Sequence, residues 1–310
     1  MRQLGYLLAL RDEQHFGRAA AACFVTQSTL SVGIAELERL LGARLVERTK
    51  RSVRFTEVGE DIAARARGIV RAAEDLATAA QANRAPLAGP LRLAVIPTIA
   101  PFVLPRLLPA LAAAWPDLRL FVREMLTGPA CEALHGGATD CVLLALPADC
   151  GAIEHYPLGN DRLLLAVPRG EDAPTAALPL DAIDPARLLL LEDGHCLKDH
   201  ALAACDLTRA NPDARLIAST LQTLVQLVDA GLGVTLLPQL AVGAGILAGT
   251  GVGAHPVAGA RAQRQLALVW RVGHARAADF RLLGATLHDA IGLAPDQASA
   301  TAAQAAISAS

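Results

Sequence analysis

Apolar and polar positions follow three different patterns along the chain, and these patterns divide it into three regions. Residues 1 to about 56 contain short stretches with apolar residues at helical spacing, and residues from about 57 to 85 continue one such pattern. From about 90 to 293, short apolar runs alternate with helical segments, which is typical of an α/β fold with a parallel sheet. We therefore expect this last region to form two subdomains of roughly 100 residues with a cleft between them.

The apolar runs of the last region predict its strands. One helix between them is expected from Thr220 to Ala230, because Thr220 can cap its start and Gly231 can follow its end. Strands are expected at residues 91–96, 118–123, 141–146, 163–167, 188–191, 216–218, 234–237 and 266–270.

The first region has the features of a winged helix-turn-helix. A short helix opens at Gly17, and Thr26 can cap a second helix that runs from Gln27 to Leu41 and ends at Gly42. Two helices joined by a tight turn are the signature of this motif. The strand-like basic stretch from 44 to 56 would form a wing beside the second helix.

Polar side chains at the start of the second helix would face the major groove of DNA. Glutamine can pair with adenine through two hydrogen bonds, and serine and threonine reach bases or phosphates. Any one of them alone could be an ordinary surface residue, but together with the basic wing they favour double-stranded DNA as a partner. The candidate DNA-binding residues are Gln27, Ser28, Thr29, Ser31, Arg48, Lys50 and Arg51.

The second region predicts one long helix from about Thr56. Its apolar positions step by four and three, as in a coiled coil, so we expect it to link the two other regions and to pair with a second copy. The positions are Val58, Ile62, Ala66, Ile69, Ala73, Leu76 and Ala80. The predicted bounds are 1–58 for the DNA-binding domain, 59–87 for the linker helix, 88–293 for the regulatory domain and 294–310 for a disordered tail.

Composition narrows the class of protein. Of the 310 residues 53% are hydrophobic, enough for sizeable cores, and the net charge of −2 still permits a local basic patch. No run approaches the ~18 apolar residues of a membrane span, and the charged N-terminus does not resemble a secretory signal. We expect a cytoplasmic protein without membrane contact. Its six cysteines form no CxxC and no zinc spacing, so we expect no metal and no other cofactor, and at most a transient disulfide.

The first 60 residues resemble the DNA-binding domain of the LysR-type transcriptional regulators. The pattern departs at Ala35, where related members often carry a basic residue, so one DNA contact is missing there. The segment from Leu190 to Asp199, followed by Cys205, resembles the redox segment of the peroxide-sensing members. The other matching stretches are His15-Phe16-Gly17-Arg18-Ala19-Ala20, Thr26-Gln27-Ser28-Thr29-Leu30-Ser31, Leu45-Val46-Glu47-Arg48, Ile96-Pro97-Thr98 and Gly233-Val234-Thr235-Leu236-Leu237-Pro238.

This resemblance implies a periplasmic-binding-protein-like regulatory domain and a thiol switch. Cys196 would be the peroxidatic cysteine and Cys205 the resolving one. It also implies a homodimer or homotetramer on promoter DNA, which recruits RNA polymerase to oxidative-stress genes, is reduced by glutaredoxin or thioredoxin, and is not an enzyme. The peroxide pocket would contain Thr98, Thr127, His195, Asp199 and Arg264.

The spacing of the two cysteines has a physical consequence of its own. They are nine residues apart, and a helix between them would separate their Cα atoms by ~13 Å, whereas a disulfide needs ~7 Å or less. Bond formation must then reshape that helix. Cys196 at the helix start would be favoured as a thiolate, with His195 and Lys198 as possible donors or positive charges nearby.

The remaining cysteines have simpler interpretations. Cys23, Cys131 and Cys141 lie in apolar runs and are expected in cores. Cys150 follows a Pro/Asp-containing loop and is expected to be exposed without a role, and His200 is expected to face solvent.

Three other functions fit parts of the sequence. A LysR-type regulator could bind a small organic effector in the cleft, a thiol peroxidase could use the same cysteines in turnover, and a solute-binding protein could have the same two subdomains. The helix-turn-helix argues against the last two.

Overall fold

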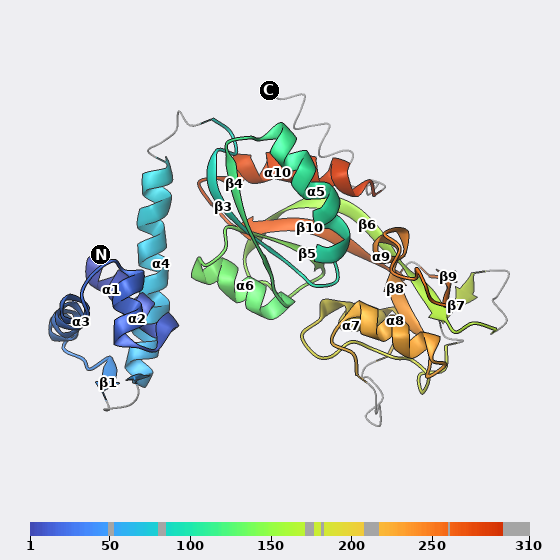
Figure 1. The fold of residues 1–310 in the computed structure, drawn as a ribbon, viewed down its shortest axis with the longest axis horizontal. Helices are drawn as coiled ribbons and strands as arrows, with labels where there is room; N and C mark the ends of the chain where they lie inside the picture. The colour runs from blue at the N-terminus through green and yellow to red at the C-terminus, as the bar shows by residue number, and fades with distance from the viewer. Residues whose placement is uncertain are drawn as a thin grey trace. The chain divides into compact units, whose positions relative to one another are not determined.

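The computed structural model describes residues 1–48, 53–79, 85–170, 177–180, 183–207, 217–259 and 261–293. The chain divides into two compact units, the first made chiefly of Met1–Asn83 and the second beginning at Arg84. Figure 1 shows the elements of both units along the chain. The tail predicted for 294–310 lies outside the described residues.

The first unit is a helix-turn-helix with a short two-stranded wing, as predicted. Its elements are α1 (Arg2–Glu13), α2 (Phe16–Ala22), α3 (Gln27–Leu41), β1 (Val46–Arg48), β2 (Val53–Phe55) and α4 (Glu57–Ala79). Leu7, Leu10, Leu30, Ile34 and Leu45 are fully buried and form the centre of one core. The strands β1 and β2 pair antiparallel, and the wing residues Lys50 and Arg51 lie outside the described residues, as does the side chain of Arg48.

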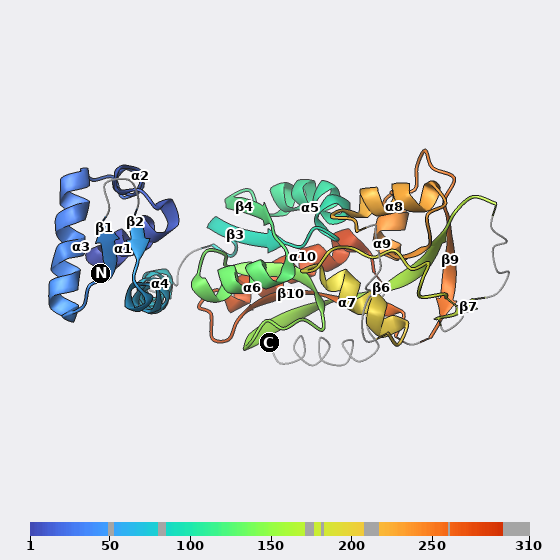
Figure 2. The ribbon, with the colours of Figure 1, turned by 90° about the horizontal axis from the view of Figure 1, so that it is seen from below.

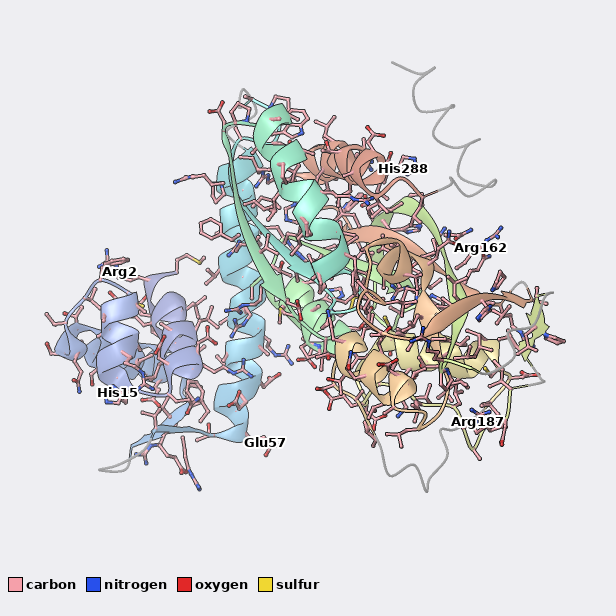
Figure 3. All side chains as sticks on the ribbon, turned by 45° about the vertical axis from the view of Figure 1, so that its right-hand side comes forward. Arg2, His15, Glu57, Arg162, Arg187 and His288 are labelled. Atoms are coloured by element: carbon pink, nitrogen blue, oxygen red, sulfur yellow. A yellow bond between two sulfur atoms is a disulfide. The ribbon has the colours of Figure 1, made fainter. Side chains whose placement is uncertain are left out.

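Local side chains fix the ends of these helices. Thr26 accepts a hydrogen bond from the Thr29 amide at 3.2 Å and so begins α3, and Gly42 ends it with a φ of 63°. The start of α2 depends on His15, which is labelled in Figure 3. Its Nδ1 accepts hydrogen bonds from the Gly17 amide at 3.0 Å and from the Arg18 amide at 3.3 Å. Histidine is not among the usual capping residues, which explains why the sequence placed this start at Gly17 instead.

The predicted apolar positions of α4 are buried in the first unit along one part of the helix and exposed along another. Ile62 packs against the core of the first unit, where α4 lies beside α1. Ile69 and Leu76, seven residues apart on the same face, are 52% and 72% exposed. This exposed face is consistent with the predicted pairing of α4 with a second copy.

The second unit is built on a mixed sheet of eight strands. They are β3 (Gly89–Val95), β4 (Leu118–Glu124), β5 (Cys141–Leu146), β6 (Ile153–Val167), β7 (Leu178–Pro179), β8 (Thr235–Pro238), β9 (Gly253–Ala258) and β10 (Gln263–Arg271). The order is β4-β3-β5-β10-β6-β9-β7, with β8 also paired to β6. Only β3, β4 and β5, and the short pair β7 and β9, run parallel, so the expectation of a parallel sheet was wrong. The reason is that β6 and β10 run in opposite directions and pair with each other over most of β10.

The long strand β6 connects two hydrophobic cores. Its Leu158 lies in a core formed with β3, β5 and β10, whereas its Leu163 and Leu165 lie in a second core with β8 and the helices around it. These cores correspond to the two predicted subdomains. The helices of the unit are α5 (Ala100–Ala114), α6 (Thr127–Gly136), α7 (Cys196–Ala204), α8 (Leu221–Asp229), α9 (Gln239–Gly243) and α10 (Ala277–Ile291). Figures 1 and 2 show α6 and α10 on opposite faces of the first subdomain's sheet.

Several strand predictions differ from the structure. The stretch 188–191 makes only isolated bridges, from Leu188 to Val234 and from Leu191 to Ala218, and Leu216 lies outside the described residues. The first half of β6 was missed because Pro157, Gly159 and polar residues interrupt its apolar pattern. A register shift between β6 and β10 absorbs this irregularity.

The cysteines of α6 and of the loop after β5 form a disulfide, which corrects two predictions. Cys131 and Cys150 are bonded, with their Cα atoms 5.2 Å apart. Both are buried, so Cys150 is not exposed and Cys131 is not a free core thiol. Their pairing depends on the packing of α6 under that loop, and sequence spacing does not reveal it.

Among the described residues no single helix is long and apolar enough to cross a membrane; only α2 and α3 together, bent by 97° at their junction, reach that length and composition.

Candidate redox site

A tight turn presents Cys196 at the first position of α7. Gly194 has a φ of 93°, a conformation that favours glycine, and His195 occupies the position before the helix. A Cβ on Gly194 would lie 3.2 Å from Cδ1 of Leu126. The turn therefore packs closely against the segment that precedes α6, and Cys196 meets that segment at a helix N-terminus, where free amide groups favour an anion.

Three separate segments enclose a narrow space beside Cys196. One segment follows β3, one precedes and begins α6, and one precedes and begins α7. The space between them is too narrow for a water molecule in this conformation, so a ligand enters only when side chains move. Its lining residues are Ile96, Pro97, Thr98, Leu126, Thr127, Gly194, His195 and Cys196. We call this space the Cys196 pocket.

Two buried polar atoms of this lining have no hydrogen-bond partner among the described residues: Oγ1 of Thr127 and Nδ1 of His195. A buried polar atom without a partner costs roughly 1–3 kcal/mol, so such atoms usually bind something. Burial lowers the pKa of His195 below its usual value, against the opposing effect of Glu192. The lowered pKa favours the neutral ring at pH 7, so of the two roles predicted for His195, hydrogen-bond donor or positive charge, it favours the donor. The neutral ring can donate or accept one hydrogen bond in the pocket.

An arginine buried next to the pocket holds Thr98 in place. Nη1 of Arg264 donates to Oγ1 of Thr98 at 2.8 Å, and Nη2 donates to the Thr98 carbonyl at 3.1 Å. The guanidinium also pairs with the carboxylate of Asp161 at 3.0 Å, and both side chains are fully buried. Asp161 was missed by the sequence analysis, since its partner lies 103 residues away. Arg264 thus reaches the pocket through Thr98 and is not part of its lining.

Two other predicted neighbours lie outside the pocket. Asp199 is exposed on the first turn of α7. Lys198 forms an ion pair with Asp193 at 2.5 Å and is not among the lining residues. Of the five residues predicted for the peroxide pocket, the structure brings Thr98, Thr127 and His195 to its lining.

The two predicted switch cysteines are separate in this structure. Cys196 is 7% exposed and belongs to the core of the first subdomain, whereas Cys205 is half-buried, follows the end of α7 and packs against the core of the second. Neither is bonded. Nine residues of helix keep their Cα atoms ~13 Å apart. Burial raises the pKa of the Cys205 thiol, so Cys205 stays protonated while α7 is folded.

His200, in the middle of α7, is buried, so its predicted exposure was wrong. Burial is the main cause that lowers its pKa, with a further contribution from Arg264, and the carbonyls of Pro147 and Leu146 oppose the shift. The loop after β5 therefore packs against α7.

Comparison with known proteins assigns both units of this chain to one protein family. Residues 1–60 match the family described as bacterial regulatory helix-turn-helix protein, lysR family, and residues 84–292 match the LysR substrate binding domain. The chain belongs to the LysR family. It is a DNA-binding regulator by that membership.

Among the relatives of this LysR-family chain is the hydrogen peroxide-inducible genes activator of Haemophilus influenzae, which is 38% identical over 88% of this chain and 91% of its own length. The HTH-type transcriptional regulator EstR of Acinetobacter baylyi is 45% identical over 78% of this chain and 80% of its own length. The DNA-binding transcriptional dual regulator OxyR of Escherichia coli is 40% identical over the same shares.

Solved structures of OxyR proteins have the same fold. A full-length OxyR variant from Pseudomonas aeruginosa matches with a TM-score of 0.77 and 34% identity, covering 92% of this chain and 93% of that one. A hydrogen peroxide-bound OxyR variant from Corynebacterium glutamicum matches with a TM-score of 0.63 and 32% identity, covering 95% and 96%. The predicted resemblance to OxyR is therefore confirmed.

The N-terminal end of α3 in this LysR-family unit, which the sequence predicts to face DNA, is exposed and rich in hydroxyl groups. Oγ1 of Thr26 lies 2.9 Å from Oγ of Ser28 and 2.8 Å from Oγ1 of Thr29. Gln27 is exposed beside them. These contacts fix the side chains at the start of the helix, which is the part that enters the major groove in this motif.

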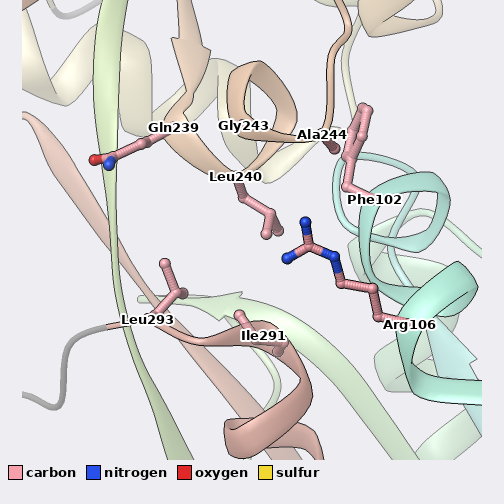
Figure 4. Close-up of a pocket in the computed structure, with 8 residues that line it drawn as sticks. All are labelled: Phe102, Arg106, Gln239, Leu240, Gly243, Ala244, Ile291 and Leu293. Carbon is pink, nitrogen blue, oxygen red and sulfur yellow. The ribbon is translucent and has the colours of Figure 1, made fainter. Parts of the chain in front are cut away.

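A second hollow in the regulatory unit of this LysR-family chain contains none of the cysteines. Arg106 extends into it from α5, toward Leu240 on α9 and Ile291 at the end of α10 (Figure 4). Among the described residues no three His, Cys, Asp or Glu side chains gather to hold a metal ion.

Proposed function

We propose that this LysR-family regulator senses hydrogen peroxide through a reversible disulfide between Cys196 and Cys205, and that the oxidised form activates oxidative-stress defence genes. The working form is a cytoplasmic homodimer or homotetramer on promoter DNA that contacts RNA polymerase. Glutaredoxin or thioredoxin returns it to the reduced form. The domain bounds 1–58, 59–87, 88–293 and 294–310 are part of this proposal.

The observation that carries the proposal is the pair of unpartnered polar atoms beside Cys196. Oγ1 of Thr127 and Nδ1 of His195 line the same pocket as the sulfur, and both lack a partner among the described residues. A small molecule with two oxygens that donate and accept hydrogen bonds satisfies both. Hydrogen peroxide has this chemistry, and the relatives named for it support the choice.

The chemistry needs only the two cysteines and peroxide. The Cys196 thiolate attacks one peroxide oxygen, the O–O bond breaks, and the departing hydroxide takes up a proton to become water. Cys205 then attacks the sulfenic sulfur, the S–S bond forms, and the hydroxyl leaves as a second water with the thiol proton. Two thiols are oxidised by two electrons, and one peroxide is reduced to two waters.

The second step changes the structure. Because Cys196 and Cys205 lie at the two ends of α7 and in different cores, the bond requires α7 to unfold or move. A nine-residue helix is marginal by itself, so its loss depends on a few packing contacts. This rearrangement would change the surface that the regulatory domain presents to its partners.

The proposal is tested by mass spectrometry after stoichiometric addition of peroxide. The wild-type chain should give a Cys196–Cys205 cross-linked peptide and changed promoter footprints. Cys196→Ser should abolish both while retaining DNA binding, and Cys23→Ser, a half-buried cysteine of the first unit, should behave as wild type. A normal response in Cys196→Ser, or a response only to an organic effector such as one bound near Arg106, would contradict the proposal.

The contribution of Thr127 to the pocket is tested by Thr127→Val. The hydroxyl is buried without a protein partner, so its replacement by a methyl group of similar size should raise the free energy of unfolding by roughly 1–3 kcal/mol. Loss of one hydrogen bond to peroxide, about 1 kcal/mol, should slow Cys196 oxidation roughly fivefold. Stopped-flow oxidation rates and urea unfolding separate the two effects. An unchanged rate would remove Thr127 from the pocket.

A further inference from the structure

The proposed peroxide chemistry leaves one pair of cysteines unused. Cys131 on α6 and Cys150 in the loop after β5 are bonded to each other and lie in the same hydrophobic core as Cys196. Their Cα separation of 5.2 Å is within the range of an unstrained disulfide. In a reducing cytoplasm a disulfide of this kind is usually transient and connected with redox sensing.

The bond joins the two elements that flank α7. On one side, α6 begins with Thr127, which lines the Cys196 pocket and lies four residues before Cys131, on the same face of the helix. On the other side, the loop that ends at Cys150 begins with Leu146 and Pro147, whose carbonyls lie beside the ring of His200 on α7. A bond between α6 and this loop therefore holds both neighbours of α7 together.

We propose that Cys131 and Cys150 form a second reversible redox couple, which sets how easily α7 rearranges. This inference rests on the proposed function, because it concerns the same switch. The bonded pair favours the conformation in which α7 is helical and Cys196 and Cys205 are apart. Reduction releases α6 from the loop and lowers the free energy needed to bring the switch cysteines together.

Peroxide can oxidise this pair of cysteines, and a small thiol can reduce it again. In the forward direction one peroxide molecule oxidises one thiol to a sulfenic acid, the other thiol displaces the hydroxyl, and two waters leave. In reverse, two molecules of a low-molecular-weight thiol such as glutathione are oxidised to their disulfide, and both cysteines regain protons. Both cysteines are buried, so the couple exchanges slowly with solutes and follows prolonged changes in redox state.

The first test measures whether the couple is reversible, in the full-length Cys196→Ser variant, where the primary disulfide cannot form. The protein is equilibrated in glutathione buffers of different redox poise, quenched, alkylated after unfolding and mapped by mass spectrometry. The Cys131–Cys150 peptide should appear in oxidising buffers and give way to two alkylated cysteines in reducing ones. A pair that stays bonded, or stays reduced, at every poise overturns the proposal.

The second test measures coupling to the switch. Cys150→Ala and Cys131→Ala should each form half of their Cys196–Cys205 disulfide at a peroxide concentration roughly fivefold lower than wild-type protein with the pair bonded, a typical coupling between sites. The matched control is Cys141→Ala, which removes a free thiol buried in the same core. Equal midpoints for wild type and both variants overturn the coupling. If the primary disulfide never forms in wild-type protein, the proposed function fails while the first test still decides whether the couple is reversible.

Discussion

Two histidines buried beside the switch make the stability of this chain depend on pH. His195 and His200 both have pKa values lowered chiefly by burial, so both are neutral in the folded chain at pH 7. The unfolded chain protonates them near 6.5. Below that pH the unfolded state binds more protons than the folded state, and stability is lost as pH falls through the folded-state values.

We therefore expect the melting temperature of the regulatory unit to fall between pH 7.5 and 5.5. His200→Asn should show a smaller fall over this range, because it removes one of the two groups. Thermal unfolding followed by circular dichroism measures both, with His155→Asn as the control at an exposed histidine. An identical pH dependence in His200→Asn and wild type would show that His200 does not contribute.

At the residue scale, the sequence predicted the contacts made within a few positions. Thr26, Gly42 and Thr220 act as predicted because a cap needs only its own helix. The Asp161–Arg264 pair joins residues 103 positions apart, and the bond from Cys131 spans 19. These partners meet only through the packing of the sheet and α6, which residue spacing does not encode.

At the level of elements, the turn before α7 controls how Cys196 is presented. Gly194→Ala should destabilise the regulatory unit by about 1–2 kcal/mol, because alanine is strained at a φ of 93° and its Cβ meets Leu126. Since the turn also forms part of the pocket, we expect a changed rate of Cys196 oxidation as well. Urea unfolding and peroxide kinetics measure the two effects.

The control for that substitution is Gly243→Ala in α9. This glycine has a helical φ and open space around the position of a Cβ. Alanine there should leave stability unchanged or raise it by about 0.5–1 kcal/mol. Similar losses at both positions would mean that the conformation of Gly194 has no special importance.

Elements with continuous periodicity were predicted well, and irregular ones were not. The helices α3 and α8 lie within a residue of their predicted bounds because apolar spacing and caps agree. By contrast, β9 was missed, since its short sequence carries Gly253 and Pro256 and depends on its pairing with β6. The antiparallel direction of β10 also depends on chain topology, which apolar runs do not specify.

At the scale of the whole molecule, the exposed face of α4 predicts how copies associate. Ile69→Glu should weaken the dimer by roughly tenfold or more, because it replaces a side chain whose burial contributes about 1.5–3 kcal/mol with a charge. The fold of the single chain should be unaffected, since Ile69 is exposed there. Sedimentation measures the dimer, and promoter affinity should fall with it.

The matched control is Ala64→Glu, which adds the same charge to an exposed position of α4 on a different face. It should leave the dimer intact. If both variants dissociate equally, or neither does, α4 does not form the interface through its Ile69 face.

The strand β6 and the start of β10 lie where the two subdomains join, and they limit the motions available to the regulatory unit. Since β6 and β10 run in opposite directions and are hydrogen-bonded to each other as far as Arg162 and Gln263, they form an antiparallel ribbon at this junction and not two independent tethers. Such a ribbon resists bending within its own plane but twists readily along its length. Any rotation of one subdomain against the other should therefore occur about the axis of this ribbon. A rearrangement of α7 would then change mainly the twist between the two subdomains.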